Sequence, residues 1–256
     1  APAEPLAPAE PLPVAPGSVP WLESITRRLG FVTSDGVRVA QIEAVATLLL
    51  VSLGLFMRFG GVVFGKPIGF WHDEANWAIR VVEQPLKDLL IRPPGFMLLT
   101  RWSVALLGKW EFAFRLLPWL AGIATPLIAV VLARRFLSRP AARLLFIGIL
   151  SLSPIAVDFS KEFKPYGVSL MLHLLLPLLV LRWHRTRRMG DLALVGIAAP
   201  LALFFSQDVL FLYPGVFLVL AVDSWRSRSY RQLGAAAAFA VLSAGIVLGM
   251  YELIWS

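Results

Sequence analysis

Long apolar blocks separated by clusters of arginine constrain this chain more than any other feature. A helix of about 20 apolar residues crosses the hydrocarbon core of a bilayer. Hydrophobic residues make up 58% of the chain and charged residues 16%, against about a quarter charged in soluble domains. The sequence therefore predicts an all-α integral membrane protein with about seven transmembrane helices. The predicted spans are residues 43–64, 113–133, 141–158, 166–182, 190–206, 208–223 and 232–254.

The arginines fall on one side of these predicted spans. Cytoplasmic connections of membrane proteins are enriched in Lys and Arg, so we expect the N-terminus and these connections to be cytoplasmic, in the inner (plasma) membrane of a bacterium. The net charge of +8 then reflects orientation, and we expect no nucleic-acid partner. The cations on this side are Arg27, Arg28, Arg38, Arg134, Arg135, Arg139, Arg143, Arg182, Arg185, Arg187, Arg188, Arg226, Arg228 and Arg231.

Three regions follow from this pattern. Residues 1–20 form a Pro-rich cytoplasmic tail, residues 21–42 an interfacial amphipathic segment, and residues 43–256 the seven-span domain with an outer loop at 65–112. Residues 93–107 of that loop are apolar, but as a helix they rise only about 22 Å, too short to span comfortably. We expect this helix to lie along the outer membrane surface. Arg58, late in the first span, is expected to extend toward the outer end.

Polar residues gather on the outer side of the predicted topology. Ionisable residues at a membrane boundary are costly and tend to be functional. A carboxylate can act as a general base, and Arg or Lys can hold a phosphate and its developing charge. The group comprises His72, Asp73 and Glu74 between Trp71 and Trp77, then Arg92, then Asp158, Lys161, Glu162, Lys164 and Tyr166, and finally Gln207 and Asp208.

Each of these residues also has a purely structural interpretation. Asp73 and Glu74 could favour a helix N-terminus through its dipole, and Asp158 and Asp208 could cap span ends. Arg92, Lys161 and Lys164 could contact lipid headgroups. Arg101 and Arg115 are expected to pair internally or with Glu111, because an unpaired buried arginine is very costly.

The order of several short motifs resembles the GT-C glycosyltransferases. The similarity is greatest to the branch that contains protein O-mannosyltransferases and lipid A aminoarabinose transferases, which use polyprenyl-phosphate-linked sugars. It covers about residues 43–225, and the ordered set is more specific than any single motif. The matching positions are Asp73-Glu74, Pro93-Pro94, Gly108, Glu111-Phe112, Arg115-Leu116 and the turn from Glu162 to Tyr166.

This resemblance implies roles for individual residues. Asp73 would be the catalytic general base and Glu74 would assist it. Arg92 would hold the lipid phosphate, with Lys161 or Lys164 as a second cation, while His72, Glu162 and Tyr166 would complete the donor site. Sugar transfer in this family inverts the anomeric centre.

The sequence leaves two questions open: whether a divalent metal is bound, and whether the protein is an enzyme or a structural subunit. Some family members need a divalent metal, which His72, Asp73, Asp158 and Glu162 could ligate; no other cofactor is implied. Family enzymes are commonly longer and carry an outer soluble domain. The alternative to an enzyme is therefore a non-catalytic structural subunit of a larger membrane complex, built on a truncated GT-C scaffold. The expected partners are membrane lipid, a polyprenyl-phosphate sugar and, in that alternative, other membrane subunits.

Overall fold

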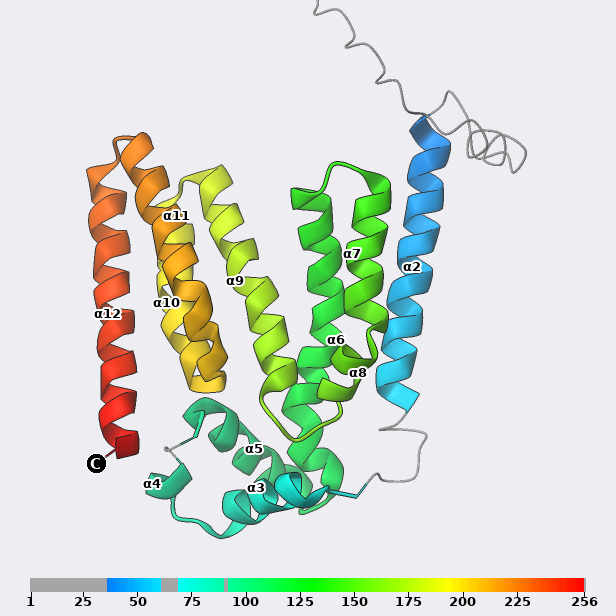
Figure 1. Ribbon diagram of the computed structural model, residues 1–256, viewed down its shortest axis with the longest axis vertical. Coiled ribbons are helices and arrows are strands. Elements are labelled where there is room, and N and C mark those ends of the chain that lie inside the picture. The colour runs from blue at the N-terminus through cyan, green and yellow to red at the C-terminus, as the bar shows by residue number, and fades with distance from the viewer. Residues whose placement is uncertain (1–35, 61–68, 90–91, 256) are drawn as a thin grey trace, which may run out of the picture. The chain divides into compact units, whose positions relative to one another are not determined.

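Figure 1 shows a computed structural model of the chain, which describes residues 36–60, 69–89 and 92–255. The predicted tail and residues 21–35 of the interfacial segment lie outside this part. The described residues form helices and no strand. The chain divides into two units, residues 1–45 and 46–256, and the second unit contains all the predicted site residues.

Five helical segments are long and apolar enough to cross a membrane, which confirms an all-α membrane protein. Two further apolar helices, α7 (Pro140–Leu152) and α10 (Met189–Phe205), are shorter. The count of seven spans stays a prediction. The five segments lie in α2 (Gly36–Gly60), α6 (Glu111–Phe136), α9 (Tyr166–Thr186), the 3₁₀ helix η1 (Gln207–Leu212) with α11 (Tyr213–Arg226), and α12 (Tyr230–Trp255).

The first loop folds into the short helices α3 (His72–Glu83), α4 (Leu86–Leu89) and α5 (Pro94–Leu107). Pro94 begins α5, where a missing N–H costs nothing and the fixed φ suits a helix. The 14 residues of α5 rise about 21 Å, as short as predicted. α5 packs against α3, α6 and α10.

The span predicted over 141–158 is not one continuous helix, because the chain breaks at Ser153 between α7 and α8 (Pro154–Phe159). Pro154 has no N–H for the carbonyl of Leu150, four residues earlier. The guanidinium of Arg58 donates to that carbonyl over 3.0 Å and to the carbonyl of Ser151 over 2.6 Å. Arg58 is fully buried, so its charge is held by backbone carbonyls of the protein and does not reach solvent as a snorkelling cation would.

Helices α6 and α9 pack together at the centre of the second unit, with α7 against α6 and α10 against α9. The core is apolar and aromatic where α3, α5 and α6 meet the loop of residues 160–165. The Arg-rich turns, α6–α7, α9–α10 and α11–α12, lie at the opposite end of these helices from α3 and α5 (Figure 1). The two ends therefore differ in charge and in composition.

Candidate active site

Phe163 fixes the 160–165 loop against three helices. Its side chain is fully buried and stacks on Phe96 of α5 at 5.6 Å between ring centroids. Its ring also contacts Trp77 of α3 and Phe114 of α6, at 6.2 and 5.5 Å. Aromatic pairs in these arrangements add stability beyond the area they bury. The residues on either side of Phe163 are consequently held close to the first turn of α3.

Two glycines let the chain pass close to α6 at this point. A Cβ on Gly122 would lie 2.2 Å from the Cβ of Ser160, so only glycine leaves room for the loop. A Cβ on Gly167 would lie 2.8 Å from the carbonyl oxygen of Phe159. Close approach of backbone is a common reason for glycine.

Glu74 connects α3 to α6 and to the 160–165 loop. Its carboxylate is almost fully buried and pairs with the guanidinium of Arg115, with a distance of 2.8 Å between Oε2 and Nη2. Arg115 Nε donates to Oε1 over 3.3 Å, and the backbone N–H of Phe163 also donates to Oε1. A fork of this kind fixes position as well as charge. Glu74 therefore anchors the first turn of α3.

Asp73, the neighbouring residue, forms an ion pair with Lys164. The Asp73 side chain is 48% exposed, whereas that of Lys164 is 4% exposed. The hydrogen bond from Lys164 is the main cause that lowers the pKa of Asp73. Burial opposes it, and the charges of Lys164, Arg92 and His72 add to the lowering. Asp73 is thus ionised and open to solvent, beside a buried cation.

Trp77 carries two cations on its indole ring. The ammonium of Lys164 lies 4.2 Å from the ring centroid and the guanidinium carbon of Arg92 lies 4.3 Å from it. Cations are attracted to the electron-rich faces of aromatic rings, most strongly to tryptophan. Burial and the nearby Arg80 lower the pKa of Arg92, while Asp73 raises it. The ring of Trp77 therefore links the Asp73–Lys164 pair to Arg92.

A cavity of about 250 Å³ adjoins Arg92, and we name it the Arg92 cavity. It combines a cation with hydroxyl, amide and carboxylate groups. Ser206 is 1% exposed, and its Oγ has no hydrogen-bond partner in the part of the chain that the structure describes. The lining residues are Trp77, Arg92, Pro93, Pro165, Tyr166, Ser206, Gln207 and Asp208.

Two apolar grooves run along the helices. The α8–α9 groove, of about 470 Å³, shares Tyr166 and Asp208 with the Arg92 cavity and is otherwise lined mainly by apolar side chains of α7, α8 and α9. The α11–α12 groove, of about 600 Å³, shares no lining residue with that cavity. The α8–α9 groove therefore continues from the polar cavity.

Five of the predicted site residues come together through these contacts and cavities: Asp73, Glu74, Arg92, Lys164 and Tyr166. Glu162 lies at the edge of the group, where burial, Glu74 and Asp158 raise its pKa. His72 is exposed beside Asp73, and Lys161 is half-buried with its backbone N–H on the carbonyl of Asp158 at 2.8 Å. None of these contacts brings the side chain of Lys161 into the group.

The structure adds detail to three expectations from the sequence. Arg115 pairs mainly with Glu74, although it also lies 3.8 Å from Glu111 as expected. Asp73 and Glu74 do begin a helix, but each carboxylate has its own cation from another segment. Within the described ranges, no three or more of His, Cys, Asp and Glu cluster in a way that could hold a metal.

The geometry defines a helical membrane protein with a polar, aromatic-walled site at one end of its helices. The chain belongs to the dolichyl-phosphate-mannose-protein mannosyltransferase family, whose sequence model matches residues 91–248. This confirms the resemblance to GT-C glycosyltransferases. The match includes Arg92, Arg115 and Lys164 but begins after Asp73 and Glu74. No curated protein and no solved structure matches the chain.

Proposed function

We propose that this protein transfers a sugar from a polyprenyl phosphate to an acceptor hydroxyl at the extracytoplasmic face of the membrane. The observation that supports this most directly is that the half-exposed carboxylate of Asp73 connects to the Arg92 cavity, because its partner Lys164 lies on the ring of Trp77, which lines that cavity with Arg92. A base and a phosphate-binding cation are the two groups that such a transfer needs. The family's own name describes mannose transfer from dolichyl phosphate to protein.

In this proposal Asp73 takes the proton of the acceptor hydroxyl, and Arg92 binds the phosphate of the donor. Glu74 assists by position, because its bonds to Arg115 and Phe163 hold the first turn of α3. Tyr166 lines the route between the Arg92 cavity and the α8–α9 groove. His72, Lys161 and Glu162 stay candidates for contacts to the rest of the donor.

The α8–α9 groove suits the isoprenoid chain of the donor. A lipid-linked sugar has a polar head joined to an apolar tail, and the groove continues from the polar cavity through Tyr166 and Asp208. The α11–α12 groove has no such continuity. Apolar lining with a few polar groups at one end is typical of sites for such ligands.

The proposed sidedness rests on charge. Arginine clusters mark cytoplasmic connections, and the Arg-rich turns lie at the end opposite the site (Figure 1). The outer loop would then be extracytoplasmic and the N-terminus cytoplasmic. A bacterial inner membrane stays an expectation from the sequence.

The function is tested with the full-length protein reconstituted in lipid bilayers and supplied with polyprenyl-phosphate sugars. Release of polyprenyl phosphate and transfer of labelled sugar are measured. We expect transfer by the wild type, and a loss of about 10²- to 10³-fold in kcat for Arg92→Gln. Arg226→Gln, an exposed arginine at the opposite end, is the control and should keep full activity. No transfer, together with stoichiometric co-purification of larger subunits, would favour the structural-subunit alternative.

A matched pair of substitutions tests the groove. Ile155 in the α8–α9 groove is 64% exposed, and Leu248 in the α11–α12 groove is 65% exposed. We expect Ile155→Trp to raise KM for a long-chain donor and to leave KM for a short-chain donor unchanged. Leu248→Trp should change neither KM. If Leu248→Trp and not Ile155→Trp raised KM for the long-chain donor, the isoprenoid chain would be assigned to the α11–α12 groove instead.

A further inference from the structure

Lys164 is a buried cation placed between two different groups. Its side chain is 4% exposed, and it pairs with Asp73 while its ammonium lies 4.2 Å from the centroid of Trp77. A desolvated charge needs an opposite charge close to it. Trp77 and Pro165, the residue after Lys164, both line the Arg92 cavity. Lys164 itself does not line that cavity, so an anion bound at Arg92 competes with Asp73 for the ammonium only when the lysine side chain extends past Trp77 toward it.

The pairing with Lys164 makes Asp73 a weak base while the site is empty. The charged groups that act on Asp73 are Lys164 from the 160–165 loop, Arg92 from the segment before α5, and His72 on α3. All three favour the carboxylate, and the hydrogen bond from Lys164 is the largest influence that lowers its pKa. A base with a depressed pKa accepts a proton poorly. The pair must loosen before Asp73 can deprotonate a hydroxyl.

We infer that Lys164 is a positioning residue, which the phosphate of the bound donor draws away from Asp73 so that the carboxylate becomes free to accept the acceptor's proton. The inference rests on the proposed function and adds a role that couples donor binding to the base. The side chain suits this role because lysine carries its charge on a flexible four-carbon stem. Arg92 lies 4.3 Å from the centroid of the same tryptophan ring. By binding the phosphate, it would bring that anion close to Lys164.

The charges balance through the step. The acceptor oxygen loses its proton to Asp73 and forms a bond to the anomeric carbon. The bond between that carbon and the phosphate oxygen breaks, and its electron pair stays on the phosphate. Asp73 thus loses a negative charge as the phosphate gains one. The attraction of Lys164 to Asp73 therefore weakens while its attraction to the phosphate grows. An interaction that strengthens toward the transition state accelerates the reaction.

The test is a titration of Asp73 in the full-length protein in nanodiscs. The carboxyl infrared band that disappears in Asp73→Asn is followed against pH, with and without polyprenyl phosphate. In the wild type, polyprenyl phosphate should raise the proton affinity of Asp73 by about 10- to 1000-fold, the usual effect of losing an adjacent opposite charge. In Lys164→Gln only the smaller, direct repulsion between the two anions should remain.

Two control variants separate the outcomes. Lys164→Arg keeps the charge and should keep part of the change, and Lys109→Gln, an exposed lysine between α5 and α6, should keep all of it. An equal change in the wild type and in Lys164→Gln, or no change in either, would overturn the inference. If the change is seen but no sugar is transferred, the proposed function fails, and only the coupling between phosphate binding and the titration of Asp73 through Lys164 stands.

Kinetics provide a second test that a merely structural role would not satisfy. The pH dependence of kcat/KM reports the free enzyme, and that of kcat reports the complex with donor. The wild type should show a higher pKa for the base in kcat than in kcat/KM. In Lys164→Gln the two values should converge, with kcat lowered about 10²-fold. A loss of folded protein with the two values still apart would contradict the inference.

Discussion

The two ends of the helices each hold an aspartate against cations, but with opposite exposure. At the end with α3, the acid is open and the cation is buried: Asp73 is 48% exposed and Lys164 is 4% exposed. At the Arg-rich end the acid is the more buried partner: Asp223 is 17% exposed, against 35% for Arg187 and 49% for His184. An exposed acid can meet a substrate, whereas a buried acid with exposed cations mainly ties segments together.

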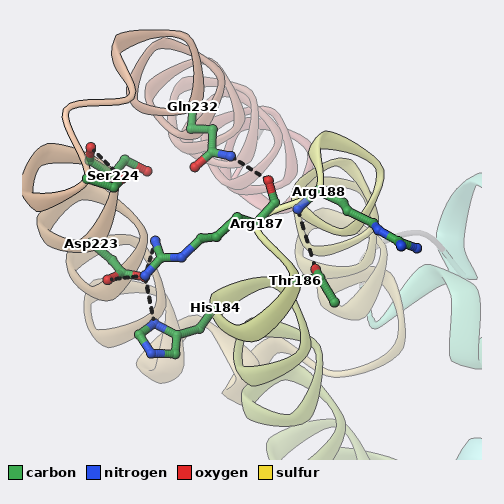
Figure 2. Close-up of polar contacts among 8 residues, drawn as sticks. His184, Thr186, Arg187, Arg188, Asp223, Ser224 and Gln232 are labelled. Carbon is green, nitrogen blue, oxygen red and sulfur yellow. Dashed lines mark hydrogen bonds and ion pairs between the residues drawn. The ribbon is translucent and has the colours of Figure 1, made fainter. Parts of the chain in front are cut away.

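The bonds around Asp223 support this distinction. Figure 2 shows Arg187, at the end of α9, reaching Asp223 of α11 with His184 beside it, and Gln232 of α12 donating to the carbonyl of Arg187. The two guanidinium contacts to Asp223 are 2.6 and 2.8 Å long. Three helices are joined through one residue. The cluster at Arg187 is therefore a structural connection, and the cluster at Asp73 is the candidate for chemistry.

The largest effect is expected from exchanging the two acids for amides. Asp73→Asn should lower kcat for sugar transfer by about 10²- to 10⁴-fold per folded molecule, because it removes the general base. Asparagine can still accept a hydrogen bond from Lys164, so folded protein should be obtained. Asp223→Asn should keep kcat and lower the thermal midpoint instead. Equal kcat values for the two variants would end the distinction between the two ends.

Glu74 should matter more for stability than Asp73 does. Glu74→Ala removes a buried partner of Arg115, which is itself 8% exposed. Breaking a buried ion pair from one side costs about 3–5 kcal/mol, and the contact of Arg115 with Glu111 places the expected loss at the lower end. The free energy of unfolding is measured by denaturant titration in detergent. A loss below about 1 kcal/mol would mean that Glu74 does not anchor α3.

Substitutions at Arg187 separate the contributions of its side chain and its backbone to the free energy of unfolding. Its φ of 54° lies in the left-handed region, which costs a residue other than glycine about 1–2 kcal/mol. Arg187→Ala loses the charged hydrogen bonds and keeps the backbone cost, so we expect a destabilisation of about 1.5–3 kcal/mol. Arg187→Gly also loses the bonds but relieves the backbone, and should be about 1 kcal/mol more stable than Arg187→Ala. Denaturant titration of both variants checks the difference, and the reverse order would contradict it.

The sequence predicted the helices well and their contacts less well. Apolar blocks and arginine clusters repeat along the chain, so the long helices and the polar end of the molecule were visible. Pro154 also indicated the break between α7 and α8, but the apolar residues on both sides of it favoured one continuous helix. The pairs Asp73–Lys164 and Glu74–Arg115 join residues 91 and 41 positions apart. No periodicity encodes such pairs, because they depend on where Phe163 packs in the folded protein.

The smallest effect on stability is expected at Glu162, whose pKa is raised whereas that of Asp73 is lowered. Burial first, then Glu74 and Asp158, raise the pKa of Glu162. The folded protein therefore binds this proton more tightly than the unfolded chain, and the charged carboxylate costs stability above the raised pKa. Glu162→Gln should stabilise the protein at neutral pH by no more than about 0.5 kcal/mol.

That gain should disappear as the pH falls through the raised pKa to the ordinary glutamate value of about 4.3. Asp73 should behave in the opposite sense, since its pKa is lowered: Asp73→Asn should cost stability at neutral pH, and the cost should fade only as the pH drops through that lowered pKa. Thermal midpoints of both variants across pH 3 to 8, each compared with the wild type, measure the two trends. Parallel trends would mean that Lys164 acts on both carboxylates alike, and the contrast between an acid with a lowered pKa and one with a raised pKa would be lost.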